Sequence, residues 1–192
     1  MTLVTPYITD KFTSYLGDDR TTVLSIAVWL TDDYTKSVPI GSIKVKMKDM
    51  DIIALRNLSG YYCFTGLLPG SYKVIVESGL YFPPDASSVN IPVPDPKKSL
   101  GIILKPKPSY PFASGATLVR GVVSGPSVNA SVKVTGKTIE TITDENGEFV
   151  LYFKGIKEEN ITIEIKNTEG TGSVPVTVKE GETISVGKII LS

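Results

Sequence analysis

The chain has 192 residues, of which 41% are hydrophobic and 21% are charged, and its 20 basic side chains balance 20 acidic ones. This composition excludes a disordered chain, and zero net charge argues against the basic field needed to bind a nucleic-acid backbone. Residues 1–115 carry 12 Lys and Arg against 10 Asp and Glu, and residues 116–192 carry 8 against 10. We therefore expect no nucleic-acid partner for either half.

Targeting and redox signals are few. No apolar run approaches the roughly 18 residues that indicate a membrane-spanning helix. Residues 1–10 show neither the basic nor the apolar region of a secretory signal peptide. The single cysteine, Cys63, excludes an intrachain disulfide. We expect a protein without a membrane span that is cytoplasmic or is exported without a cleaved signal peptide.

The first half of the chain is predicted to be an N-terminal arm followed by a β-domain. Residues 1–20 show little periodicity and are expected to form a loose arm or a short helix. Apolar residues occupy both faces of the alternating segment 22–30, which predicts a strand that is covered on both sides. Lysines alternate with apolar residues in 43–48, which predicts a half-exposed strand. Further strands are expected at 61–65, 72–78, 89–93 and 100–105, completing a domain over residues 21–106.

A proline-rich linker is predicted to separate this domain from a second one. Residues 107–115 form the linker, and prolines at 106, 108 and 111 are expected to hold it extended and stiff. Residues 116–192 then form the second domain, with seven short strands. These are Leu118–Val123, Ser131–Thr135, Lys137–Ile142, Glu148–Phe153, Ile161–Ile165, Val174–Val178 and Ile184–Leu191.

The second domain is predicted to be a repeat of the first. Similar segments begin at residues 42 and 131, at 60 and 147, and at 101 and 187, which gives offsets of 89, 87 and 86 residues. Such a drift requires only small loop insertions. No segment longer than about ten residues shows helical periodicity. The sequence therefore predicts an all-β protein built from two tandem seven-stranded β-sandwiches.

Within these repeats, three segments resemble the carboxypeptidase regulatory-like domain. They are Val119–Val123, Ser131–Val134 and the hairpin Thr143–Phe149. The first copy carries the related pattern Gly60-Tyr61-Tyr62 and Leu67–Val74, whereas the second copy lacks its Leu-Pro-Gly motif. The resemblance implies two prealbumin-like sandwiches, the first diverged. It also implies an accessory, adhesive or structural module, since members of that family rarely catalyse reactions.

Groups able to catalyse a reaction or hold a metal are scarce. The absence of histidine excludes Ser-His-Asp and Cys-His catalysis and histidine-ligated metals. We expect no enzyme activity, no cofactor and no metal. Asp18-Asp19 and Asp32-Asp33 have oxygen ligands for calcium, but their spacing favours solvated turn carboxylates. Cys63 is expected to pack on the strand face opposite Tyr62 and Phe64 rather than act as a nucleophile.

Aromatic residues near the linker are the candidates for partner contact. They are Tyr81, Phe82, Tyr110 and Phe112, with Tyr61 on an outer strand face extending the group. Rigid aromatic side chains on loops favour recognition of proteins or sugars, although the same residues can pack the two domains together. We expect a non-enzymatic structural or accessory module in a larger assembly, such as a cell-surface or phage-tail-like particle, with a protein partner. The alternative is a carbohydrate-binding module.

Overall fold

The structure is a computed structural model that describes residues 22–95, 97–124, 129–168 and 170–191, with the backbone of two short strands near the N-terminus. In these ranges every regular element is a β-strand, so the all-β prediction is confirmed. No helix capable of crossing a membrane occurs among the residues described. Strands β1 (Tyr7–Ile8) and β2 (Thr13–Ser14) pair antiparallel as a separate hairpin. The rest of residues 1–20, including Asp18-Asp19, lies outside the described residues.

The first sandwich contains seven strands in two sheets. One sheet has the order β5-β6-β3-β9, and the other has the order β4-β7-β8. The strands are β3 (Leu24–Asp32), β4 (Ile43–Met47), β5 (Leu55–Arg56), β6 (Tyr62–Thr65), β7 (Gly70–Ser78), β8 (Ser87–Ile91) and β9 (Leu100–Leu104). Their inward side chains form one core, centred on Val28, Val45, Phe64, Val74 and Leu104.

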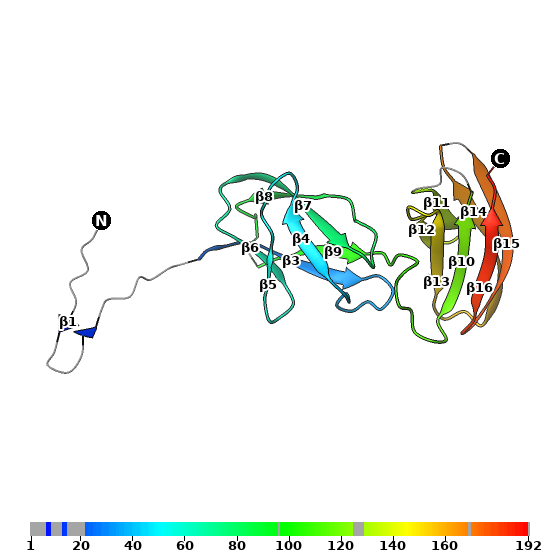
Figure 1. Cartoon of the computed structure of the whole chain (residues 1–192), viewed down its shortest axis with the longest axis horizontal. Coiled ribbons are helices and arrows are strands. Elements are labelled where there is room, and N and C mark those ends of the chain that lie inside the picture. Colours follow the sequence, from blue (N-terminus) through cyan, green and yellow to red (C-terminus); the bar gives the residue numbers. More distant parts are fainter. Residues whose placement is uncertain are drawn as a thin grey trace.

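The second sandwich also contains seven strands in two sheets. The sheet orders are β13-β10-β16 and β12-β11-β14-β15. The strands are β10 (Thr117–Val123), β11 (Ser131–Val134), β12 (Glu140–Ile142), β13 (Glu148–Phe153), β14 (Glu158–Lys166), β15 (Thr171–Lys179) and β16 (Thr183–Ile189). A separate core includes Val119, Val132, Phe149, Leu151 and Ile163. In Figure 1 this group of strands follows the first along the long axis of the picture.

The two sandwiches have matching strand orders with one difference. The first strand of each, β3 or β10, lies between an antiparallel neighbour (β6 or β13) and a parallel neighbour (β9 or β16). The short third strand differs, because β5 joins β6 whereas β12 joins β11. Before β5, an isolated bridge between Lys46 and Ile53 still holds the chain beside β4. The crossing to the other sheet therefore occurs within two residues.

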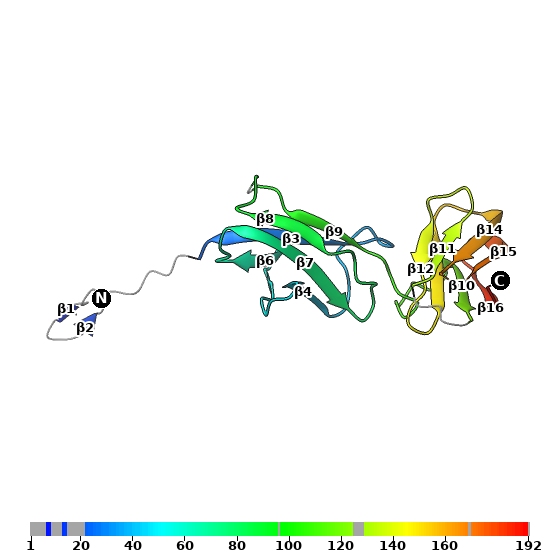
Figure 2. The ribbon, with the colours of Figure 1, turned by 90° about the horizontal axis from the view of Figure 1, so that it is seen from above.

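Strand β3 is buried on one face only. Its inward residues Ile26, Val28, Leu30 and Asp32 are buried, whereas the alternate side chains are only partly covered. The prediction that both faces are covered is therefore wrong for the described structure. Figure 2 shows this sheet from above, with β3 between β6 and β9.

Candidate functional site

A buried carboxylate stands at the end of β3 nearest the second sandwich. Asp32 is 0% exposed. One of its oxygens accepts hydrogen bonds from the hydroxyls of Tyr81, at 2.8 Å, and Tyr110, at 2.6 Å. The other accepts the backbone N–H groups of Tyr34, at 2.7 Å, and Thr35, at 3.1 Å. Asp32 is therefore not the solvated turn carboxylate that the sequence predicted, because four donors replace its hydration.

The two tyrosines hold their protons firmly in this environment. Burial raises the pKa of Tyr81 to about 12, and the adjacent Asp32 carboxylate contributes to this shift. Burial and the same carboxylate also raise the pKa of Tyr110. Only a protonated phenol can donate to a carboxylate. The raised pKa values therefore keep both hydroxyls in the form that makes the observed hydrogen bonds. As donors of this kind, the two hydroxyls are suited to holding structure.

Tyr110 brings the linker into this cluster. The sequence predicted an extended linker, but residues 107–116 fold into consecutive turns. The N–H of Tyr110 donates to the carbonyl of Lys107 at 3.0 Å, and the N–H of Ala116 donates to that of Ala113 at 3.0 Å. The expectation of an extended segment is therefore wrong. The Tyr110 side chain belongs to the first core and is anchored there by Asp32, which draws the chain back against the first sandwich.

An aromatic cluster joins the two sandwiches. Tyr34, from the loop after β3, lies edge-on to Phe112 of the linker, with ring centroids 5.0 Å apart, and to Tyr152 of β13, at 5.4 Å. Phe112 also packs against Tyr110, at 4.8 Å, and lies 6.0 Å from Tyr152. We call Tyr34, Tyr110, Phe112 and Tyr152 the junction aromatics. Edge-to-face pairs at such distances add specific geometry to apolar burial.

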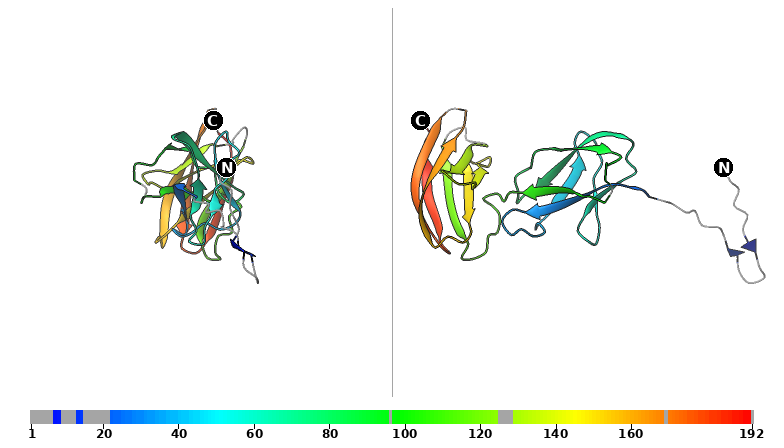
Figure 3. Two further views of the ribbon diagram at one scale, coloured as in Figure 1. Left: turned by 90° about the vertical axis from the view of Figure 1, so that its left-hand side faces the viewer. Right: turned by 180° about the vertical axis from the view of Figure 1, so that it is seen from behind.

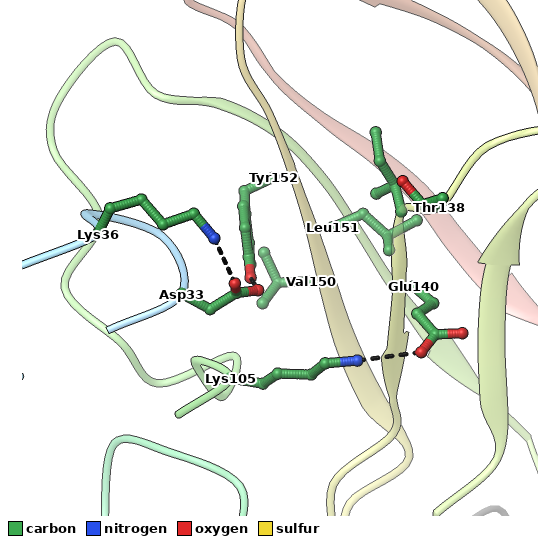
Figure 4. A pocket seen from close by; sticks show the side chains of 9 residues that line it. Asp33, Lys36, Lys105, Thr138, Glu140, Val150, Leu151 and Tyr152 are labelled. Carbon is green, nitrogen blue, oxygen red and sulfur yellow. Dashed lines mark hydrogen bonds and ion pairs between the residues drawn. The ribbon is translucent and has the colours of Figure 1, made fainter. Parts of the chain in front are cut away.

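Next to these rings, a second aspartate links the sandwiches by polar contacts. Asp33 accepts a short hydrogen bond from the Tyr152 hydroxyl and forms an ion pair of 2.5 Å with Lys36. Figure 4 shows the side chains of Tyr152 and Lys36 both pointing toward the carboxylate of Asp33. Burial acts to raise the pKa of Asp33, but the hydrogen bonds from Lys36 and Tyr152 and the charges of Lys36 and Lys105 outweigh it and leave this pKa lowered. The junction therefore favours the ionised carboxylate.

Polar contacts continue around the rim of the junction. The Arg120 guanidinium donates to the carbonyl of Pro108 at 2.8 Å and stacks over Phe112 at 5.6 Å. Lys105 of the first sandwich contacts Glu140 of the second at 3.2 Å. A cleft of about 370 Å³ lies beside these contacts and is lined by Asp33, Lys36, Lys105, Glu140 and Tyr152 among others (Figure 4). The charged side chains of its lining are paired with each other or with Tyr152, so these contacts act as a joint.

The second sandwich meets this joint with the outer face of its β13-β10-β16 sheet. Leu118 and Val150 project from that face and are buried under Tyr34 and Phe112. The end of the first sandwich therefore rests on a sheet face of the second. Figure 3 shows the same arrangement from behind, with the strands of the second sandwich steep to the long axis of the first.

The structure distributes the predicted contact residues unequally. Tyr81 and Tyr110 are 1% and 5% exposed, and Phe82 is also buried, so their positions favour packing over contact with a partner. Phe112 is half-buried within the junction. Tyr61 lies apart from the others, against Trp29 at 4.8 Å on the outer face of the first sandwich.

Three of the residues that build the joint were not singled out from the sequence. They are Tyr34, Arg120 and Tyr152, of which only Arg120 lies in a segment that carries the family resemblance, Val119–Val123. Asp32 itself carried a usable signal, since it continues the alternation of Ile26, Val28 and Leu30 and must point inward. Cys63 lies on the face opposite the buried Tyr62 and Phe64, as predicted. Within the described ranges no cluster of three acidic or cysteine side chains could hold a metal ion.

Comparisons with known proteins give only distant likenesses. No family model and no curated protein matches the chain. The chain is similar to the TIE protein of Bacillus anthracis, with 14% identity and a TM-score of 0.36, over 94% of this chain but only 38% of that protein. It is also similar to shaft pilin spaA from Lactobacillus rhamnosus GG, with 9% identity and a TM-score of 0.32, over 90% and 98% of the two chains. A streptococcal ancillary pilin matches with 12% identity and a TM-score of 0.30, over 96% and 68%.

Proposed function

We propose that this protein is a non-enzymatic structural module that holds two β-sandwiches in a fixed arrangement within a larger protein assembly. The observation that carries this proposal is the joint itself. Tyr110 fastens the linker to the buried Asp32, and Tyr152 fastens the second sandwich to Asp33. Two domains joined by a linker move relative to each other unless their interface holds them, and these contacts fix the two sandwiches in one arrangement.

The chemistry of the described residues supports a structural role. The acidic groups at the junction are paired with tyrosines, backbone amides and lysines, and this holds also for Asp33 and Glu140, which line the cleft. The chain also contains no histidine to serve as a neutral-pH base. We therefore assign no catalytic residue.

The proposal extends to the origin of the two sandwiches. Their strand orders match at six of seven positions, which supports tandem copies of a prealbumin-like domain related to the carboxypeptidase regulatory-like domain. We place the copies at residues 21–106 and 116–192, with 107–115 between them. The folded linker belongs physically to the first copy, because Tyr110 lies in its core.

An affinity pull-down from the native host tests the assembly role. Tagged protein is purified and the co-purifying proteins are identified by mass spectrometry. We expect a defined set of partners in stoichiometric amounts. A bait that brings down no protein contradicts the proposal, and a glycan array then tests the carbohydrate alternative.

A junction variant makes this test specific for rigidity. Phe112→Ala removes a ring that contacts three other junction aromatics and packs only at the edge of the first core, of which it is not a fully buried member. We expect weaker capture of partners with both sandwiches still folded by thermal unfolding. Leu58→Ala, at a fully exposed turn of the first sandwich, is the matched control and should capture partners normally. Equal capture by both variants would show that the fixed arrangement is not required.

A further inference from the structure

The outer face of the β5-β6-β3-β9 sheet is apolar and incompletely covered. Trp29 and Tyr61 stack on it, Ala27 lies opposite Cys63, and Gly101 lies beside Trp29. At its two sides Leu55 and Ile103 are 72% and 60% exposed. None of these side chains is charged. An uncharged aromatic surface of this kind is typical of a surface that another segment covers.

The same face of the second sandwich is covered, which provides an internal precedent. Cys63 and Val150 each stand three residues after a turn glycine, Gly60 and Gly147, both of which have positive φ. The cross-strand pair Ala27–Cys63 therefore corresponds to Arg120–Val150. Val150 is completely buried, whereas Cys63 is only partly buried. The equivalent residues Val150 and Cys63 thus differ in how far other residues cover them.

The cover of the second sandwich is supplied partly by the segment that enters it. Pro108 accepts the Arg120 hydrogen bond and Phe112 stacks on Arg120, and both precede β10 in the chain. The segment that enters the first sandwich in the same way is the N-terminal arm, residues 1–20. By sequence the arm is rich in apolar and aromatic residues, namely Met1, Leu3, Val4, Tyr7, Ile8, Phe12, Tyr15 and Leu16.

We propose that the N-terminal arm docks on the outer face of the β5-β6-β3-β9 sheet of its own chain. The β1–β2 hairpin pairs with no other described strand, and an isolated two-stranded hairpin is marginally stable in water. It needs a surface to bury its apolar side chains, and this face offers one on the sandwich to which the arm is attached.

The length and attachment of the arm allow this docking. Nine residues, 15–23, separate β2 from β3, and can span about 30 Å when extended. Trp29 lies five residues after Leu24, the first residue of β3, which is about 17 Å along the strand. A tether of this length also gives the arm a local concentration in the millimolar range at the face. The arm would therefore compete with any partner that uses the same face.

Trp29 reports directly on this docking, because it is the only tryptophan in the chain. In the full-length protein, Tyr7→Ser, Phe12→Ser and Tyr15→Ser are combined to remove the three aromatic rings of the arm. We expect the emission of Trp29 to move to longer wavelength and its quenching by acrylamide to increase, since the arm no longer shields the indole. These substitutions lie outside both cores, so the sandwiches should unfold at an unchanged or slightly lower temperature.

The matched control replaces three threonines of the same arm, Thr5, Thr9 and Thr13, by serine. This variant keeps the aromatic rings and should retain the emission of the wild type. The arm proposal is overturned if the aromatic variant and the threonine variant have the same emission and quenching.

A dilution series separates docking within one chain from exchange between copies. We expect the spectral difference to be independent of protein concentration, with a monomer mass by light scattering throughout. A difference that disappears on dilution together with a dimer mass would overturn docking within one chain. A difference that requires an added host protein would likewise overturn it and identify a foreign occupant. None of these outcomes depends on the pull-down that tests the assembly role.

Discussion

The same sheet position lies within a joint in the second sandwich and is left open by the described residues in the first. The Arg120–Val150 pair lies under the linker and the end of the first sandwich, whereas no described segment covers the Ala27–Cys63 pair in this way. Strand order is common to both, so topology alone does not make an interface. The difference comes from the long Arg120 side chain, which reaches Pro108 of the linker. It also comes from Tyr34 and Phe112, which pack on this face at the end of the first sandwich.

The two sandwiches also differ in how their buried polar groups are used. In the second, the Thr143 hydroxyl accepts the backbone N–H of Ala130 at 2.8 Å, which is a local contact within that sandwich. In the first, Asp32 gathers hydroxyls from Tyr81 and Tyr110, which are distant in the chain. In this protein the buried Asp32 carboxylate therefore fixes the linker to the first sandwich, whereas the Thr143 hydroxyl closes a loop within the second.

The largest effect expected from breaking this difference comes from Asp32→Ala. The change leaves two tyrosine hydroxyls and two backbone amides without their acceptor, and we expect a loss of about 3–5 kcal/mol in the stability of the first sandwich. Thermal unfolding by calorimetry should show a separate early transition, while the second sandwich unfolds near its normal temperature. Asp51→Ala, at an exposed position of the same sandwich, is the control. An equal shift in both variants would contradict the role assigned to Asp32.

A glycine of the second core gives the next largest effect. Gly121 stands where the first sandwich has Val28, and a Cβ there would lie 2.6 Å from Val186 and 2.7 Å from Phe149. Gly121→Ala should therefore cost about 1–3 kcal/mol by overpacking. Gly101→Ala is the matched control, because a Cβ there meets no atom within 4 Å. Chemical denaturation compares the two variants, and a harmless Gly121→Ala would show that the second core is looser than described.

Acidification should weaken the joint through Asp33. Its pKa is lowered from the ordinary 3.8, so ionised Asp33 stabilises the folded protein above that pH, and the contribution is lost as the pH falls through the lower folded-state value. We expect Asp33→Asn to unfold at a lower temperature than the wild type near neutral pH and to lose less stability on acidification below 3.8. The difference between their unfolding temperatures should therefore shrink with falling pH. A constant difference over the acidic range would contradict the lowered pKa.

Much of the fold could be predicted from period-two alternation. Alternation is a local property, so it identified six strands of the first sandwich and all seven of the second within a few residues. It missed β5, because two residues are too short to show a period. Alternation also does not indicate which other segments cover a sheet face. For this reason β3 was expected to be covered on both sides.

The joint itself could be predicted only in part. Clustered aromatics in 110–112 indicated packing or contact, and Tyr110 and Phe112 do take part in the joint. Their partners Tyr34 and Tyr152 lie far away in sequence, and nothing local connects them. The linker was expected to be extended because proline restricts the backbone, but Pro108 lies at the second position of the Lys107–Tyr110 turn, where proline is favoured, and the Tyr110 hydroxyl donates to Asp32.

The smallest expected effect concerns the exposed ion pair that crosses the junction. Glu140 lies 3.2 Å from Lys105 of the first sandwich and 3.2 Å from Lys133 of its own sandwich, and hydrogen bonds from these lysines lower its pKa. Since all three side chains are about half exposed, Lys105→Ala should cost about 0–1 kcal/mol, and added salt should remove the difference. Lys133→Ala is the control with the same geometry but no crossing. If the joint depends on its aromatic and buried contacts, both lysine variants should match in unfolding temperature at high salt, and a persistent loss confined to Lys105→Ala would show that surface charge also holds the sandwiches together.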